Sequence, residues 1–243
     1  MIEFARLSDK TELSRMWQNI FLEEREITEL FFENIFDKAV TPVIRQNGEI
    51  VSSLFLLPCK IGEFEGKCVY CAMTLPRYRG KGYMKKLLDF SYDYCRDNGF
   101  DFLILVPAEK SLFDYYGKCG FERFGVRKSY VWGSSDNSSD KFLKTDCELL
   151  FDGKIIDYWQ NACVHYGGEI IEIKDFSGMA FTDDTTVIKN ARGSIKGIPE
   201  KYRKSGVKIQ GNIDFGETES PAMIRTENGK IKRLKCFVGI TLE

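Results

Sequence analysis

The stretch Thr74-Leu75-Pro76-Arg77-Tyr78-Arg79-Gly80-Lys81-Gly82 decides the fold of this 243-residue chain. Pro76 has no amide hydrogen to give to a β-ladder, so the apolar strand predicted over residues 67–75 ends there. Gly80 and Gly82 allow the main chain to approach a ligand without an intervening side chain. Because apolar residues recur at helical spacing directly afterwards, the stretch predicts a strand, a tight glycine loop and a helix.

The predicted helix starts at Tyr83 and stops at Gly99, and its apolar face comprises Met84, Leu87, Leu88, Ser91, Tyr92 and Cys95. The first amides of a helix have no intrahelical partner and lie at the positive end of its dipole, so they attract anions. Five cations surround this helix start: Arg77, Arg79, Lys81, Lys85 and Lys86. The loop lacks the Gly-Lys-Ser/Thr step of a P-loop and the third glycine of a dinucleotide fingerprint. We therefore predict a phosphate site of another kind.

The flanking segments predict a mixed α/β domain. Asn47-Gly48 is a hairpin turn signal between two apolar runs. Ser8 is a candidate N-cap for the first helix, and Gly66 is expected to break the chain before the strand that leads to the loop. Strands are expected over residues 2–7, 41–46, 49–61, 102–106 and 121–132, and helices over residues 8–20, 24–36 and 110–118.

A polar segment of small residues over 134–141 is the best linker candidate. It divides the chain into a predicted first domain, residues 1–133, and a C-terminal α+β domain, residues 142–243. In the latter, a helix is expected over residues 154–166, and strands over 147–151, 169–173, 179–182, 207–213 and 234–241.

Composition narrows the function classes. The net charge is -1, which gives no global reason to expect nucleic acid or an anionic membrane as a partner. Eight cysteines without a secretory signal indicate a reducing cytoplasm and free thiols. Cys68 and Cys71 form a C-x-x-C on a predicted strand, without a second pair to complete a tetrahedral site, and His165 has no nearby ligand set. No metal site is expected.

Two motifs resemble those of GNAT acetyltransferases. The run Arg77-Tyr78-Arg79-Gly80-Lys81-Gly82 resembles the acetyl-CoA signature Arg/Gln-x-x-Gly-x-Gly/Ala, and its preceding strand and proline also fit. The run Tyr116-Gly117-Lys118-Cys119-Gly120-Phe121 resembles the second hallmark, Tyr-x-x-x-Gly-Phe. The resemblance implies the GNAT fold, a mixed central sheet flanked by helices, for about the first half of the chain.

The resemblance also implies roles for individual residues. Amides of Arg79, Gly80, Lys81, Gly82, Tyr83 and Met84 would hold the pyrophosphate of acetyl-CoA, a cosubstrate, with Arg77 and Lys81 near phosphate. The main chain at Met73, Thr74 and Leu75, splayed from the strand at 103–106, would pair with the pantetheine arm. Met84 departs from the small residue that many members carry there.

The implied reaction is direct attack of a neutral amine on the thioester. Amides near Leu75 would stabilise the oxyanion, and Tyr116 is the candidate general acid for the departing thiolate. The alternative is that Tyr116 is a core aromatic beside Tyr115. No general base is identified: Glu63 and Glu65 lie just before the central strand, but are equally consistent with solvated turn residues. Many such enzymes route the proton through water.

Several alternatives stay open at this level. One is a non-catalytic acyl-CoA-binding regulatory module, and another is a longer acyl donor. The acceptor amine and the oligomeric state are undetermined. Five glutamates on the first two helices are either attractants for a cationic acceptor or ordinary surface charges: Glu23, Glu24, Glu26, Glu29 and Glu33. The C-terminal half loosely resembles the degenerate second domain of tandem GNAT proteins of the enhanced-intracellular-survival type, which would bring Glu243 near the site.

Overall fold

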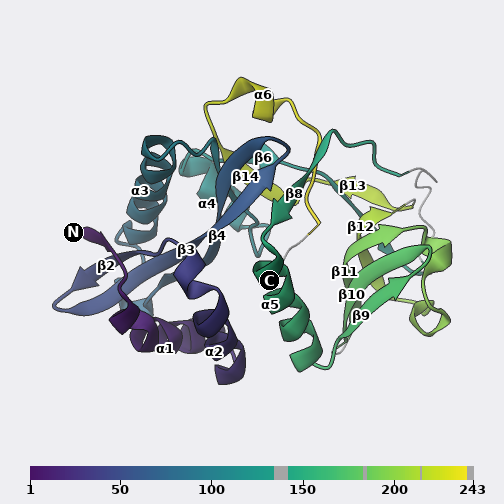
Figure 1. Cartoon of the computed structure of the whole chain (residues 1–243), viewed down its shortest axis with the longest axis horizontal. Coiled ribbons are helices and arrows are strands. Elements are labelled where there is room, and N and C mark those ends of the chain that lie inside the picture. Colours follow the sequence, from purple (N-terminus) through teal and green to yellow (C-terminus); the bar gives the residue numbers. More distant parts are fainter. Residues whose placement is uncertain (134–141, 183–184, 214, 240–243) are drawn as a thin grey trace. The chain divides into compact units, whose positions relative to one another are not determined.

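The computed structural model describes residues 1–133, 142–182, 185–213 and 215–239 (Figure 1). Contacts divide the chain into two compact units. Unit 1 comprises Met1–Glu122, Leu150–Tyr158 and Met223–Ile231, and unit 2 comprises Arg123–Leu149, Trp159–Ala222 and Lys232–Glu243. The two units interleave in sequence. The domain boundaries expected at residues 133 and 142 stay a prediction, and the linker over 134–141 lies outside the described residues.

Unit 1 is built on a mixed sheet with the strand order β1-β2-β3-β4-β5-β14. The strands are β1 (Ile2–Phe4), β2 (Pro42–Gln46), β3 (Glu49–Ile61), β4 (Phe64–Thr74), β5 (Phe102–Leu105) and β14 (Ala222–Arg225). Neighbours are antiparallel except for β4 and β5, which are parallel. The mixed sheet flanked by helices confirms the predicted fold class.

Helices cover both faces of this sheet (Figure 1). They are α1 (Lys10–Phe21), α2 (Arg25–Asn34), α3 (Tyr83–Asp97) and α4 (Leu112–Lys118). Trp17 of α1 and Phe31 of α2 pack on Phe55 of β3, with ring centroids 5.7 Å and 4.8 Å away. On the opposite face, buried Leu87 and Leu88 of α3 belong to one core cluster with strand residues. The period of two along β3 and β4 supplies an apolar residue to each layer.

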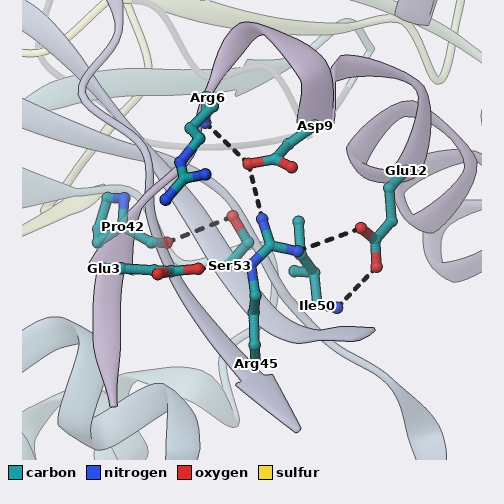
Figure 2. Close-up of polar contacts among 8 residues, drawn as sticks. All are labelled: Glu3, Arg6, Asp9, Glu12, Pro42, Arg45, Ile50 and Ser53. Atoms are coloured by element: carbon teal, nitrogen blue, oxygen red, sulfur yellow. Dashed lines mark hydrogen bonds and ion pairs between the residues drawn. The ribbon is translucent and has the colours of Figure 1, made fainter. Parts of the chain in front are cut away.

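A charged network around Arg45 of β2 fastens the edge of this sheet to the first helix (Figure 2). Its guanidinium donates to Glu3 and lies 2.7 Å from Asp9 and 3.4 Å from Glu12, measured between nitrogen and carboxylate oxygen. The other oxygen of Glu12 accepts the amide hydrogen of Ile50 at 2.6 Å. One cation therefore links β1, the entrance to α1 and the β2–β3 hairpin.

Unit 2 contains a six-stranded sheet with the order β13-β7-β12-β11-β10-β9. The strands are β7 (Arg127–Val131), β9 (Glu169–Ile173), β10 (Phe176–Thr182), β11 (Thr186–Gly193), β12 (Lys208–Ile213) and β13 (Glu217–Glu219). Two further strands, β8 (Cys147–Phe151) and β15 (Cys236–Phe237), pair in parallel. The chain also contains the strand β6 (Glu122–Phe124), the helix α5 (Gly153–His165), which is divided between the two units, and the helix α6 (Gly229–Lys232), most of which belongs to unit 1.

Three local expectations are corrected. Gly66 lies inside β4, where the ring of Phe102 would be 2.4 Å from any added Cβ, so it marks a close approach and not a break. The single strand over 121–132 is two strands, because Gly125 between β6 and β7 has a φ of +76°. Ser8 is not an N-cap: it lies in a short 3-10 turn, Leu7–Asp9, ahead of α1.

In the described part of the chain, no helix combines the length and the apolar composition needed to cross a membrane.

Candidate functional site

The first component of the site is the end of β4, beyond its pairing with β5. β4 pairs with β5 at Gly66–Cys68, opposite Phe102–Ile104, and β4 then continues to Thr74 without a registered β5 partner in the described ladder. A bulge lies in between: the register with β3 shifts, and Cys71 has a φ of +50°. A bulge bends the strand and increases its twist. β4 thus continues past its registered pairing with β5, which ends at Leu105, and the splay expected from the sequence stays a prediction.

The end of β4 leaves the main-chain amide of Thr74 open and not that of Leu75. The amide of Leu75 donates to the carbonyl of Val51 at 3.0 Å, and its carbonyl accepts from the amide of Tyr78 at 2.8 Å. Main-chain groups of successive residues in an antiparallel strand point to opposite sides, so those of Thr74 face away from β3. Met73, one step further back, faces β3 again. Thr74 is therefore the residue of the predicted trio that presents an open amide to a ligand.

The second component is the glycine loop. Pro76–Tyr78 form one turn of 3-10 helix, and Gly80 and Gly82 follow with φ values of +74° and +73°. These left-handed conformations suit glycine, and an added Cβ at either position would meet no atom within 4 Å. The loop thus turns two bare stretches of main chain toward open space.

The amides of this loop form an anion-binding feature of unit 1. Arg79 donates its amide hydrogen to the carbonyl of Pro76 at 3.2 Å, and the first amide bound inside α3 is that of Lys86, which donates to Gly82 at 3.1 Å. Between them, the described residues give no main-chain acceptor to the amides of Gly80–Met84. Successive free amides at a helix N-terminus form a cradle for a phosphate.

The cationic side chains of the loop have different partners within the protein. Arg77 forms an ion pair with Glu49 of β3, and the hydrogen bond that its guanidinium donates to that carboxylate raises the pKa of Arg77. The Nε of Arg79 donates to the carbonyl of Thr74 at 3.2 Å, so this side chain holds the loop against the strand end. The ammonium of Lys81 lies 4.8 Å from the ring centre of Tyr78.

The two lysines on the first turn of α3 complete the predicted set of cations. Lys85 pairs with Asp89 one turn later at 2.8 Å. Lys86 lies 5.9 Å from the ring centre of Tyr83. Lys81 and Lys86 contact only aromatic rings among the interactions described above, so they could contact a pyrophosphate bound at the amides without breaking an ion pair. Arg77 and Lys85 would first have to break their ion pairs with carboxylates.

Tyr116, the candidate acid, lies on α4 and packs on the same core cluster as Tyr83 and Met84. Its ring centre is 6.1 Å from that of Phe121. Burial, with a smaller contribution from the Cys119 thiol, raises the pKa of Tyr116 to about 12. The hydroxyl is therefore protonated at neutral pH and can donate. The second motif ends the helix as expected, since Gly120 has a φ of +86°.

Arg225 of β14 is a part of the site region that the sequence did not reveal. It donates to the carboxylate of Asp89 at 2.7 Å and to the carbonyl of Cys119 at 3.1 Å. Its guanidinium also lies 4.3 Å from the ring centre of Tyr92. It thereby joins α3, which starts at the loop, to the end of α4, which carries Tyr116.

The carboxylates considered as bases are not poised for that role. Glu65 pairs with Lys60 at 2.6 Å, and the hydrogen bond from Lys60 lowers the pKa of Glu65. Glu63 is exposed on the turn before β4. Glu29 of α2, considered as an attractant for a cationic acceptor, pairs with Arg25 at 2.6 Å. Glu243 lies outside the described residues.

The chain was compared with known proteins. The family model described as "Acetyltransferase (GNAT) domain" matches residues 2–124. A conserved protein of Enterococcus faecalis V583, described as "Probable N-Acyltransferase", has 10% identity and a TM-score of 0.68, covering 93% of this chain and 72% of its own. The chain is also similar in structure to two GCN5-related N-acetyltransferases. That of Kribbella flavida has 12% identity and a TM-score of 0.59, covering 93% of this chain and 72% of its own. That of Anabaena variabilis has 13% identity and a TM-score of 0.55, covering 94% of this chain and 73% of its own.

These structural likenesses, at such low identity, support the fold over nearly the whole chain and nothing beyond it. No curated protein matches the chain. The family model covers half of the sequence, including both motifs that carry the site up to Phe121. The chain therefore belongs to the GNAT acetyltransferase family.

Proposed function

We propose that this protein is an N-acetyltransferase that moves the acetyl group of acetyl-CoA to a primary amine by direct attack. The observation that carries the proposal is the row of open amides at Gly80–Met84. Two residues of this row, Gly80 and Gly82, have a left-handed main chain with no atom within 4 Å of an added Cβ. Such a row suits the pyrophosphate of the coenzyme. The open amide of Thr74 lies just before this row in the chain, on the side of β4 that faces away from β3.

In the proposed reaction, the lone pair of the amine attacks the thioester carbon, and a tetrahedral oxyanion forms. The amide of Thr74, which faces away from β3, is the donor proposed for the oxyanion in place of Leu75, whose amide is engaged. The carbon–sulfur bond then breaks, and the Tyr116 hydroxyl donates a hydrogen bond to the departing thiolate. Because the pKa of Tyr116 is about 12 and that of a free thiol is about 8.5, stabilising the thiolate is favoured over complete proton transfer.

The proton lost by the attacking amine has no assigned protein acceptor. β4 holds one acidic residue, Glu65, and it is paired with Lys60. We therefore propose that water carries this proton away. The acceptor amine itself is left as a class, a neutral primary amine.

Isothermal titration with acetyl-CoA tests the coenzyme site. Gly82→Glu places a carboxylate where the pyrophosphate would lie and should raise the Kd at least about tenfold, which corresponds to about 1.4 kcal/mol. Gly48→Glu is the matched control, because Gly48 also has a left-handed φ, +84°, and open space around it, but lies on the β2–β3 hairpin turn. The control should bind as the parent does.

Equal loss of binding in both variants, or no binding by the parent, would overturn the proposal. A thiol-release assay with a panel of amines then separates an enzyme from a module that only binds the coenzyme. Amine-dependent release of CoA is expected of the enzyme alone.

A further inference from the structure

Two cysteines of unit 2 lie directly opposite each other on paired strands. β15 runs parallel to β8, with Cys236 in register with Cys147. Neighbouring strands are about 4.8 Å apart, which lies within the range of Cα separations that a disulfide spans. Among the other strand pairs whose register the structure gives, no cysteine lies opposite a second one. All eight cysteines have free thiols.

The two thiols lie within hydrogen-bonding reach of each other. A side-chain hydrogen bond joins the thiols of Cys147 and Cys236. Burial raises the pKa of both thiols, and at Cys147 the hydrogen bond from Cys236 partly offsets that rise. Cys236 is buried, whereas Cys147 is partly exposed. Cys147 is thus the thiol that an external reagent can reach and that ionises more readily.

The main chain holds the pair in place on both sides. The carbonyl of Cys236 accepts the amide hydrogen of Val126 at 2.8 Å. Lys235 and Asp146, the residues just before the two cysteines, exchange two hydrogen bonds: the Asp146 amide donates to the Lys235 carbonyl at 2.9 Å, and the Lys235 amide donates to the Asp146 carboxylate at 2.8 Å. The two Cα atoms are therefore fixed opposite each other before any covalent bond forms.

We propose that Cys147 and Cys236 are a reversible dithiol–disulfide pair, oxidised by a low-molecular-weight disulfide such as oxidised glutathione. The Cys147 thiolate attacks one sulfur of the reagent, which releases one glutathione thiolate and leaves a mixed disulfide on Cys147. Cys236 loses its proton and attacks the Sγ of Cys147, which forms the Cys147–Cys236 bond, breaks the bond to glutathione and releases the second glutathione thiolate. Two thiols of the protein are oxidised, one external disulfide is reduced to two thiols, and the released thiolates take up the two protons.

The disulfide would tie β15 to β8. β15 is two residues long, and its pairing with β8 rests on few main-chain hydrogen bonds. A crosslink between residues far apart in sequence removes much conformational freedom from the unfolded chain, so the oxidised form should melt higher by several degrees. A reductant in excess should reverse the shift, because Cys147 is partly exposed.

The experiment treats the native full chain with oxidised glutathione, then blocks residual thiols in denaturant and maps peptides by mass spectrometry. The expected result is one linked pair, Cys147 with Cys236, and a fall in free thiols from eight to six. Two single variants test the order of attack. Cys236→Ser should trap glutathione on Cys147, whereas Cys147→Ser should leave the buried Cys236 unmodified.

Cys163→Ser is the matched control, because the Cys163 thiol is buried and contacts the carbonyl of Ala180 at 3.7 Å. It should form the same disulfide as the parent. The parent measurement needs no substitution, so a variant that fails to fold does not weaken the test. An unlinked parent, or linkage spread over other cysteines, overturns the proposal.

Discussion

The guanidinium of Arg225 donates a hydrogen bond to the carboxylate of Asp89 at 2.7 Å, across 136 positions of sequence. Burial alone would raise the pKa of Asp89, but hydrogen bonds from Lys85 and Arg225 outweigh it and lower that pKa. The same guanidinium binds the carbonyl of Cys119 at the end of α4. A strand from late in the chain thereby holds together the two helices that carry the proposed coenzyme loop and the proposed acid.

Replacing Arg225 should destabilise the protein measurably. Arg225→Ala leaves Asp89 and the Cys119 carbonyl without their charged donor, and we expect a loss of about 2 kcal/mol in the free energy of unfolding. Urea denaturation followed by circular dichroism measures it. Arg233→Ala, at an exposed arginine of the same C-terminal region, should change stability by less than about 0.5 kcal/mol. Similar small effects in both variants would contradict the structural role of Arg225.

The local chemistry of the chain predicted much of this architecture. β3 matches its prediction exactly at Glu49–Ile61, because the Asn47-Gly48 turn fixes where it starts, and both turn residues have the left-handed φ values that such a turn requires. β8 and β9 likewise match at both ends. The loop and α3 follow from proline, glycine and helical spacing.

The remaining elements depend on long-range pairing. β14 has four residues, too few for a period to be read, and its place beside β5 is set by pairing with residues more than a hundred positions earlier. β11 escaped prediction too, and its register with both neighbours is irregular. Within the site, the sequence predicted which segment is open but not that Thr74, and not Leu75, offers its amide. That distinction follows from the register with β3.

The ion pair between Arg77 and Glu49 competes with a phosphate for the arginine. If the coenzyme binds at the loop as proposed, Glu49→Gln should free Arg77 and lower the Kd for acetyl-CoA by about two- to threefold at low ionic strength. The gain should vanish in about 0.5 M salt, where exposed charges are screened. Titration calorimetry at two salt concentrations measures it, and Glu63→Gln, an exposed acid on the turn before β4, is the control. Weaker binding by Glu49→Gln would mean that Glu49 holds Arg77 in its working position.

The network around Arg45 should make stability depend on pH in the acid range. Burial alone would raise the pKa of Asp9, but the Arg6 amide and the Arg45 guanidinium lower it below its ordinary value. The stability from Asp9 is therefore full above the unfolded pKa, about 3.9, and is lost as pH falls through the lower folded value. Arg45→Met should lose about 2 kcal/mol at pH 7 and show a smaller further loss between pH 5 and pH 3 than the parent.

Urea denaturation at pH 7, 5 and 3 checks this expectation. Arg15→Met, at an exposed arginine on α1, serves as the control and should follow the parent at each pH. An Arg45 variant whose acid dependence equals that of the parent would show that the carboxylates around it titrate independently of Arg45.

The role proposed for Tyr116 leads to a prediction about both rate and pH. Tyr116→Phe removes the donor to the thiolate and should lower kcat about 100-fold, with little change in the KM for acetyl-CoA. Because the pKa of Tyr116 is raised to about 12, the hydroxyl is protonated throughout the range in which the rate can be measured. Between pH 8 and pH 10, titration of Tyr116 should therefore not lower the kcat of the parent. The pH profiles of the parent and of Tyr116→Phe should have the same shape in this range. Tyr115→Phe is the matched control, since Tyr115 is adjacent but more exposed, and it should retain at least about half of the parent kcat. Equal losses in the two variants, or a Tyr116-dependent fall in rate near pH 9, would remove Tyr116 from the mechanism and return it to the role of a core aromatic.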